Sequence, residues 1–103
     1  MSATHVDERN FNKVVLGSDV PVMVDFFAAW CAPCRQLSGT IEEIADENDG
    51  NYKVCKIDID ESPNLTRKYA VSSVPTVVVF KDGNVSRRIT GLRQKDELLG
   101  LLS

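Results

Sequence analysis

The sequence predicts an α/β protein with a mixed β-sheet, and two observations support that prediction. Three apolar runs rich in β-branched residues, at 20–27, 52–59 and 76–80, alternate with segments of helical spacing. Such alternation is typical of a parallel sheet covered by helices on both faces. Asp82-Gly83 then joins the last run to another β-rich segment, and this dipeptide is a strong hairpin signal. The hairpin adds antiparallel strands, so we expect the sheet to be mixed.

The first half of the chain contains the expected strand and helix of the sheet's centre. After a short strand, Asp7 is expected to cap a first helix that ends at Gly17. Residues 20–27 are predicted to form a strand buried on both faces. Helical spacing returns over residues 32–48, and residues 49–51, Asp-Gly-Asn, end that helix.

The second half of the chain completes the predicted sheet. Residues 52–59 form the next strand, and Ser62 and Pro63 begin a short helix as its N-cap and first helical residue. The remaining elements are two strands and a last helix, at 76–80, 85–90 and 94–102. We therefore interpret residues 1–103 as a single domain, with a central sheet of four to five strands flanked by four helices.

The composition restricts the partners that the protein can bind. The 103 residues are 43% hydrophobic and 26% charged, which is enough apolar material for a core. The net charge is −3 and the basic residues are scattered among acids, so neither nucleic acid nor an anionic membrane is an expected partner. The sequence has no signal-peptide pattern and no apolar segment near the roughly 20 residues that span a bilayer. We predict a cytoplasmic location.

The chain has three cysteines, and two of them are close together. An odd number does not describe a disulfide-stapled secreted scaffold, but it fits a reducing compartment. Cys31 follows the predicted buried strand, and Pro33 falls in the first turn of the next helix, where its missing N–H is harmless. Cys31 is thus expected at a helix N-terminus, which favours thiolate over thiol. Cys34 lies one turn further on the same side and can reach the first sulfur.

Two other interpretations of the cysteine pair are weaker. A structural zinc site needs a full set of Cys or His ligands, and beyond the pair the chain offers only Cys55 and His5. No metal is therefore expected. A merely structural pair remains open, although burial alone rarely places cysteines at a strand-to-helix corner. Cys55, inside a predicted strand, is interpreted as a small buried hydrophobic residue.

Several motifs together resemble the thioredoxin family in order and spacing. They are Trp30-Cys31-Ala32-Pro33-Cys34, Val24-Asp25-Phe26, Val74-Pro75-Thr76 and Gly91. The resemblance covers essentially the whole chain. It implies the thioredoxin fold and a Cys31–Cys34 redox disulfide, with Ala32 standing where glycine is commonest in the family.

The resemblance also assigns roles near the pair. Asp25 interrupts an apolar run, so it is either buried or reaches solvent at the strand end. The family implies a buried acid with a raised pKa that moves the proton of Cys34. Lys56, which taken alone suits a strand edge, would temper that acid.

A further set of residues is implied to bind substrate: Trp30, Ala32, Pro33, Val74, Pro75 and Gly91. From the residues alone, Trp30 is as easily a core residue, Gly91 a strand terminator, and the Val74–Pro75 bond trans. The family implies an exposed Trp30, a cis bond that leaves the Val74 backbone free for an extended substrate segment, and an open surface at Gly91.

The resemblance implies a general protein thiol–disulfide oxidoreductase. Cys31 would attack a disulfide in a protein substrate, Cys34 would resolve the mixed disulfide, and thioredoxin reductase would regenerate the dithiol. No bound cofactor is implied, and a monomer is expected. The alternative is a non-catalytic, thioredoxin-like binding subunit of a larger assembly, which the intact pair and Asp25 argue against.

Overall fold

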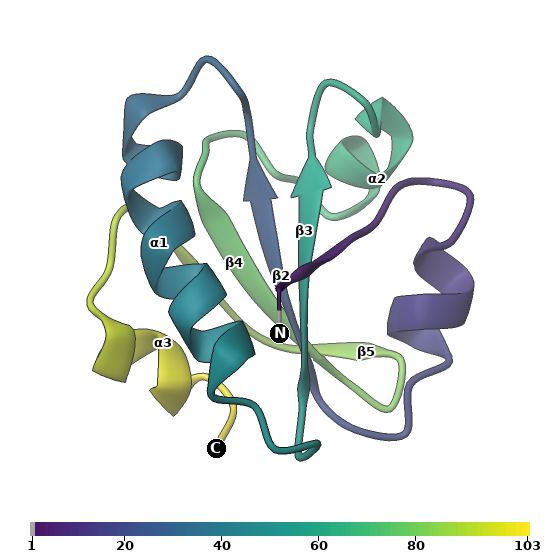
Figure 1. Cartoon of the computed structure of the whole chain (residues 1–103). Helices are drawn as coiled ribbons and strands as arrows, with labels where there is room; N and C mark the ends of the chain where they lie inside the picture. The colour runs from purple at the N-terminus through teal and green to yellow at the C-terminus, as the bar shows by residue number, and fades with distance from the viewer. Residues whose placement is uncertain (1) are drawn as a thin grey trace.

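The computed structural model describes residues 2–103 and shows a five-stranded sheet with helices on both faces (Figure 1). The strands are β1 (Thr4–His5), β2 (Val22–Phe27), β3 (Lys53–Asp58), β4 (Thr76–Lys81) and β5 (Asn84–Thr90). They lie in the order β1-β3-β2-β4-β5. β3 pairs in parallel with β1 and β2, whereas β4 pairs antiparallel with β2 and β5. The predicted mixed sheet is confirmed, with β2 at its centre.

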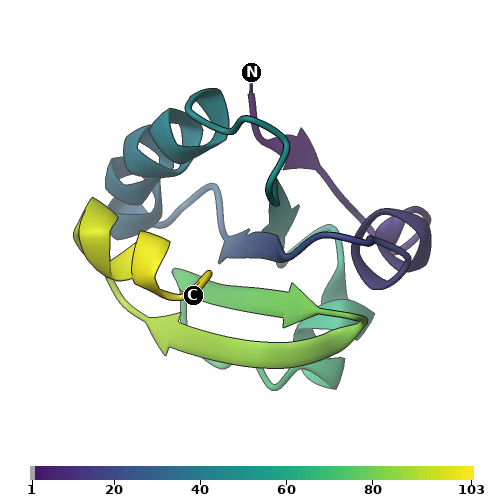
Figure 2. The same ribbon diagram turned by 90° about the horizontal axis from the view of Figure 1, so that it is seen from below.

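The helices divide between the two faces of the sheet. They are the π-helix η1 (Asn12–Leu16) and the α-helices α1 (Ala32–Asp46), α2 (Pro63–Lys68) and α3 (Lys95–Gly100). Figures 1 and 2 show α1 and α3 on one face and η1 and α2 on the other. Within residues 2–103, none of these helices is long and apolar enough to cross a bilayer.

The sheet separates two hydrophobic cores. Successive side chains of a strand point to opposite faces, so β2 gives Val22, Val24 and Phe26 to the η1 and α2 side, and Met23 to the α1 and α3 side. All these side chains are fully buried, which confirms that the central strand is covered on both faces. By the same alternation Asp25 faces α1. An acid thus enters the apolar layer beneath the longest helix.

The hairpin between β4 and β5 forms where the sequence predicts it. Asp82 and Gly83 both have positive φ, at 52° and 79°. This left-handed conformation at two successive residues suits the twist of the flanking strands. Gly83 adopts it without the steric cost of a Cβ atom.

The first helix differs from the prediction. Asp7 does not cap an α-helix; its carboxylate accepts hydrogen bonds from the backbone N–H and the guanidinium of Arg9. The helical segment that follows is a five-residue π-helix, although Gly17 does end it. Phe11 and Val15 are nevertheless both buried. The spacing of the apolar residues thus predicts the buried side of this segment correctly, although it does not predict the kind of helix.

The start of α2 also differs in its chemistry. Ser62 occupies the N-cap position, as predicted, but among the described residues its buried hydroxyl has no hydrogen-bond partner. The carboxylate of Glu8 instead accepts hydrogen bonds from the N–H groups of Asn64 and Leu65. A residue 56 positions from Asn64 therefore caps the helix.

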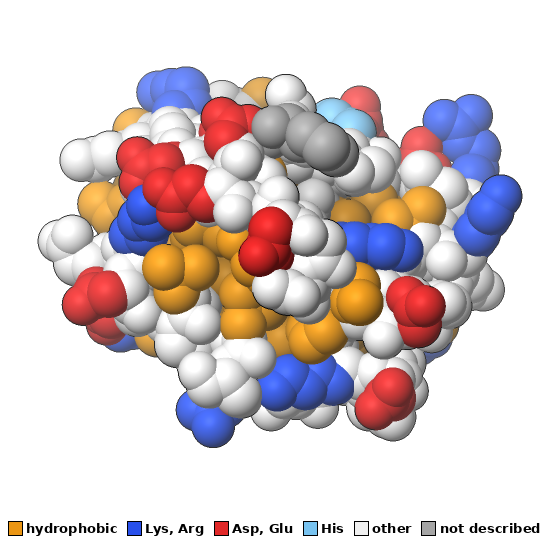
Figure 3. Space-filling view, turned by 60° about the horizontal axis from the view of Figure 1, so that its bottom comes forward, with side chains coloured by type: hydrophobic (Ala, Val, Ile, Leu, Met, Phe, Trp, Pro, Cys, Tyr) orange, Lys and Arg blue, Asp and Glu red, His pale blue; other side chains and the backbone are white. Residues whose placement is uncertain are grey.

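The charged side chains are mixed on the face shown in Figure 3. Acidic and basic groups are interspersed there around a central group of hydrophobic side chains. The net charge of −3 is thus not gathered into one acidic area on this side of the molecule.

Candidate active site

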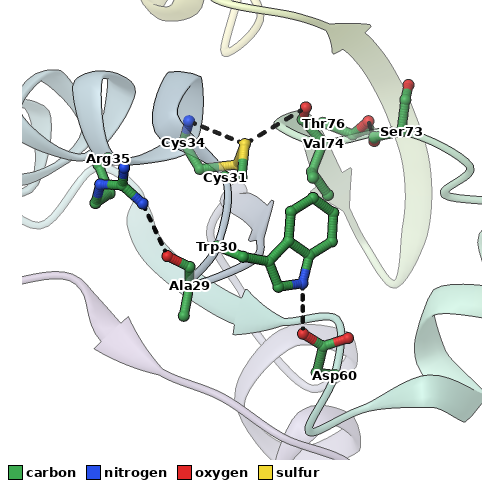
Figure 4. Close-up of a disulfide and its surroundings, with 9 residues drawn as sticks. All are labelled: Ala29, Trp30, Cys31, Cys34, Arg35, Asp60, Ser73, Val74 and Thr76. Atoms are coloured by element: carbon green, nitrogen blue, oxygen red, sulfur yellow. Dashed lines mark hydrogen bonds between the residues drawn. A yellow bond between two sulfur atoms is a disulfide. The ribbon is translucent and has the colours of Figure 1, made fainter.

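The cysteine pair lies at the corner between β2 and α1. Cys31 is the N-cap residue of α1, and its Sγ accepts a hydrogen bond from the backbone N–H of Cys34 at 3.2 Å (Figure 4). The two residues form a disulfide, with Cα atoms 5.2 Å apart. Pro33 lies in the first turn of the helix, where its missing N–H is not needed. When the disulfide is reduced, the N–H of Cys34 and the helix dipole are both placed to stabilise negative charge on Cys31 Sγ.

The pair is shielded by a small apolar cluster. Ala28 and the two cysteines form a buried cluster, and Phe27, Ile59 and Val74 pack against it. Cys31 keeps 6% of its surface exposed and Cys34 keeps 2%. Cys31 is therefore the more accessible cysteine of the pair.

A second segment, the one that precedes β4, approaches Cys31. The carbonyl oxygen of Val74 lies 3.8 Å from Cys31 Sγ (Figure 4). The Val74–Pro75 peptide bond is cis, as the resemblance implies. The carbonyl of Pro75 accepts a hydrogen bond of 2.8 Å from the N–H of Gly91. Segments far apart in the sequence thus meet beside one sulfur atom.

Gly91 lies on an open part of this surface. Its φ is +97°, a conformation that side chains with a Cβ rarely adopt. A Cβ built at Gly91 would have no neighbouring atom within 4 Å. The positive φ is therefore what favours glycine at this position, and not a lack of space for a side chain.

Trp30 is an exposed residue, so its interpretation as a core residue is wrong. It is 68% exposed, and its indole Nε1 donates a hydrogen bond of 2.9 Å to Asp60 (Figure 4). The sequence motifs described above do not include Asp60. A signal did exist: Trp30 follows β2 and Asp60 follows β3, and the carboxyl ends of adjacent parallel strands share one edge of a sheet.

Asp25 is fully buried, so the alternative in which it reaches solvent is wrong. Neither of its carboxylate oxygens has a hydrogen-bond partner among residues 2–103. Burial raises the pKa of Asp25 from 3.8 to about 7; the Lys56 ammonium opposes that rise and the Glu42 carboxylate adds to it. At neutral pH the group can therefore both accept and release a proton.

Lys56 lies next to Asp25 on the neighbouring strand. The two are direct partners in the parallel pairing of β2 and β3. Because β3 is an interior strand, the interpretation of Lys56 as a strand-edge residue is wrong. Its Nζ donates a hydrogen bond of 2.8 Å to Ser38 Oγ and lies 3.8 Å from a carboxylate oxygen of Glu42.

A pocket connects the lysine with the second cysteine. It has a volume of about 240 Å³ and is lined by Phe27, Ala28, Ala29, Cys34, Arg35, Ser38 and Lys56. The pocket gives the buried side of the cysteine pair a polar boundary made of a hydroxyl and an ammonium. Among the described residues, no group of His, Cys, Asp or Glu side chains is arranged to hold a metal ion.

Cys55 takes no part in this arrangement. It is a free thiol, fully buried in the core on the η1 side of the sheet. Burial raises the pKa of the Cys55 thiol to about 11, which keeps it protonated and unreactive. Its interpretation as a small hydrophobic residue is confirmed.

A model of the family described as Thioredoxin matches residues 2–103. The chain belongs to the thioredoxin family. It is similar to the thioredoxin of Rickettsia felis, with 46% identity over 97 residues that cover 94% of this chain and 92% of that protein. It is also similar to the thioredoxin of Pseudomonas aeruginosa, with 40% identity over 98 residues that cover 95% and 91%.

A solved structure supports the fold of this thioredoxin-family chain. A mutant thioredoxin from Halobacterium salinarum superposes with a TM-score of 0.88 at 34% identity, covering 98% of this chain and 88% of that one. The expected thioredoxin fold is confirmed. With the Cys31–Cys34 pair joined at the start of α1, this thioredoxin-family protein is a thiol–disulfide oxidoreductase with protein-disulfide reductase activity.

Proposed function

We propose that Cys31 is the nucleophile and Cys34 the resolving cysteine of this reductase. The Cys31 thiolate attacks one sulfur of a substrate disulfide, forming a mixed disulfide and releasing the first substrate thiolate. Cys34 then gives up its proton and attacks Cys31 Sγ, which releases the second thiolate. Two electrons pass from the dithiol to the substrate, and the pair ends as the disulfide. The observation that carries this proposal is the N-cap position of Cys31, with the Cys34 N–H on its sulfur.

Asp25 is proposed as the group that receives the Cys34 proton. Its pKa of about 7 suits a base that must accept a proton near neutral pH and return it to the departing thiolate. Lys56 is its proposed tuning residue, since it is the direct cross-strand partner of Asp25. Burial would otherwise leave Asp25 protonated over a wider pH range.

The proposed substrate surface surrounds Cys31. Ala32 and Pro33 are exposed beside the sulfur, and Trp30 forms an exposed apolar side. The Val74 carbonyl next to the sulfur suits pairing with the main chain of an extended segment, in the manner of an added strand. Gly91 leaves room for that segment.

We propose disulfide-containing proteins as substrates and a thioredoxin reductase as the electron donor, so that the chain acts in electron transport as a carrier without a bound cofactor. We further propose a monomeric single domain that works in the cytoplasm, because a reducing compartment keeps a cycling pair reduced. The alternative, a non-catalytic binding subunit, is not favoured. Such a role would not need two bonded cysteines with an ionisable acid buried nearby.

Reduction of insulin by dithiothreitol, followed as turbidity, tests the proposed roles. The wild-type protein should accelerate precipitation, and Cys31→Ser should abolish the acceleration. Cys34→Ser should accumulate a mixed disulfide that gel electrophoresis without reductant detects. Cys55→Ala is the matched control because it removes the buried third thiol, and it should remain active. Full activity of Cys31→Ser would refute the assignment.

A further inference from the structure

Ser38 has a position along α1 that the proposed mechanism does not use. Cys34, Ser38 and Glu42 follow one another at intervals of four residues, so they share one face of the helix. That face meets β3 at Lys56, whose Nζ contacts Ser38 and approaches Glu42. The hydroxyl of Ser38 therefore lies one turn closer to the cysteine pair than the carboxylate of Glu42 does.

The two distances from Lys56 Nζ show which group holds the ammonium. The hydroxyl of Ser38 accepts a hydrogen bond of 2.8 Å, whereas the nearest carboxylate oxygen of Glu42 is 3.8 Å away. A charge-assisted hydrogen bond between an ammonium and a carboxylate is normally about 2.7–2.9 Å long. The Lys56 ammonium thus makes no hydrogen bond of this length with the Glu42 carboxylate, although the two groups are neighbours. The ammonium is hydrogen-bonded to the neutral hydroxyl and not to its anionic neighbour, whose other carboxylate oxygen accepts a hydrogen bond of 2.9 Å from the N–H of Ala3.

The ring of Phe27 supports the same placement of the ammonium. Lys56 Nζ lies 5.0 Å from the centroid of this ring, a distance at which the face of an aromatic ring attracts a cation. Phe27, Ser38, Lys56 and Cys34 all line the 240 Å³ pocket. The ammonium is therefore held at the boundary of the pocket that reaches the resolving cysteine.

We propose that Ser38 is a positioning residue for disulfide exchange: its hydroxyl holds the Lys56 ammonium at the pocket beside Cys34 and prevents it from closing onto Glu42. This rests on the proposed roles of Asp25 and Lys56. Without the hydroxyl, the ammonium moves about 1 Å closer to the Glu42 carboxylate. The two groups then reach the separation that an ammonium–carboxylate pair prefers. The ammonium is then drawn away from the Asp25 carboxylate, and it stabilises that carboxylate less because the attraction between the two charges falls with distance.

The ionisable groups around Asp25 define the expected direction. Lys56 faces it from β3 and Glu42 from α1, with the two cysteines at the start of that helix. β4 presents Val77, an apolar partner, and His5 of β1 lies beyond Lys56. Lys56 is the one cation in this set. If it stabilises the Asp25 carboxylate less, the pKa of Asp25 rises further. Less of the base is then ionised below neutral pH.

The test is a titration of Asp25 by carboxyl ¹³C NMR in the oxidised protein, in which the bonded cysteines do not titrate. In Ser38→Ala, the midpoint for Asp25 should move to higher pH than in the wild type. Ser38→Thr keeps the hydroxyl and should restore the wild-type midpoint. Thr40→Ala is the matched control, because it removes a hydroxyl from the same helix in the groove formed with Leu92 and Arg93; it should leave the midpoint unchanged.

Kinetics provide the second readout. In single-turnover reduction of insulin by the pre-reduced protein, Ser38→Ala should be about two- to threefold slower at pH 6.5 and equal to the wild type at pH 8.5. In a Lys56→Met background, Ser38→Ala should change neither the midpoint nor the rate. An unchanged midpoint in Ser38→Ala, or an effect that persists undiminished in Lys56→Met, would overturn the proposal. If Asp25→Asn reduces insulin at the wild-type rate at every pH, the role of Asp25 fails, while the titration still decides whether Ser38 holds the lysine.

Discussion

Trp30 donates a hydrogen bond of 2.9 Å to Asp60, although 68% of the tryptophan surface is exposed. An exposed indole with one fixed contact presents a defined apolar face beside Cys31 (Figure 4). The contact joins the loop after β2 to the loop after β3, which are the two loops at one end of the parallel pair. The contact that orients the ring thus comes from the loop after β3 and not from the motif that contains Trp30.

Removal of this contact should loosen the ring. In Asp60→Ala, we expect faster anisotropy decay of the Trp30 fluorescence and a KM for insulin about threefold higher, the effect of losing a hydrogen bond of about 0.7 kcal/mol. Asp60→Asn keeps an acceptor oxygen and serves as the control, with values near those of the wild type. Identical anisotropy decays in all three proteins would show that the hydrogen bond does not orient the ring.

Asp25 should make stability depend on pH. Its pKa in the folded protein is about 7, above its ordinary value of 3.8, so the folded state binds this proton more tightly than the unfolded chain does. The stability that the protonated acid provides is complete below about pH 4 and is lost as pH rises to about 7. The free energy of unfolding of Asp25→Asn should therefore exceed that of the wild type by up to about 4 kcal/mol at pH 8. Near pH 4 the two free energies should be equal. Guanidinium denaturation at several pH values measures the difference, and a constant difference across that range would contradict the assignment.

Two glycines should respond oppositely to alanine. Gly39 lies within α1, and a Cβ built there meets no atom within 4 Å. Gly39→Ala should raise the free energy of unfolding by about 1 kcal/mol, the difference in helix propensity. Gly91→Ala should lower it, because φ is +97° at that position. Chemical denaturation of both variants measures these changes, and destabilisation by Gly39→Ala would show that α1 needs flexibility at that point.

The cap of α2 gives a further prediction. Glu8→Ala should lower the free energy of unfolding by about 1 kcal/mol, because the N–H groups of Asn64 and Leu65 lose their shared acceptor. Ser62→Ala should leave the stability unchanged or raise it, since it removes a buried hydroxyl without a partner among the described residues. Thermal unfolding of both variants compares them directly. A larger loss in Ser62→Ala than in Glu8→Ala would show that serine supplies the cap after all.

The sequence predicts the elements of this fold well where one local signal dominates. The apolar run of β2, the Asp82-Gly83 turn and the strand-to-helix corner at Cys31 each depend on a few neighbouring residues, and each is confirmed. The first helix is less predictable. Aspartate often caps helices, but the carboxylate of Asp7 binds the nearby Arg9 instead. Local hydrogen bonds of short acidic side chains compete with helix capping in just this way.

The site was less predictable wherever it depends on contacts across strands. The family resemblance places Lys56 near Asp25, but the two residues taken alone do not indicate a contact, because only the parallel pairing of β2 and β3 makes them direct partners. Ser38, Asp60 and Glu8 each act on a residue at least 18 positions away in the sequence, where spacing carries no information. Their partners are determined by tertiary packing.

The 3.8 Å approach of the Val74 carbonyl to Cys31 Sγ spans 43 positions of the sequence. An isolated peptide of residues 29–46 would contain both thiols and the start of the helix, but not the segment before β4 that faces Cys31. Such a peptide could exchange disulfides as any small dithiol does, without choosing among protein targets. With the proposed substrate surface, selectivity among protein targets would therefore require the folded chain, whereas simple thiol reactivity would not.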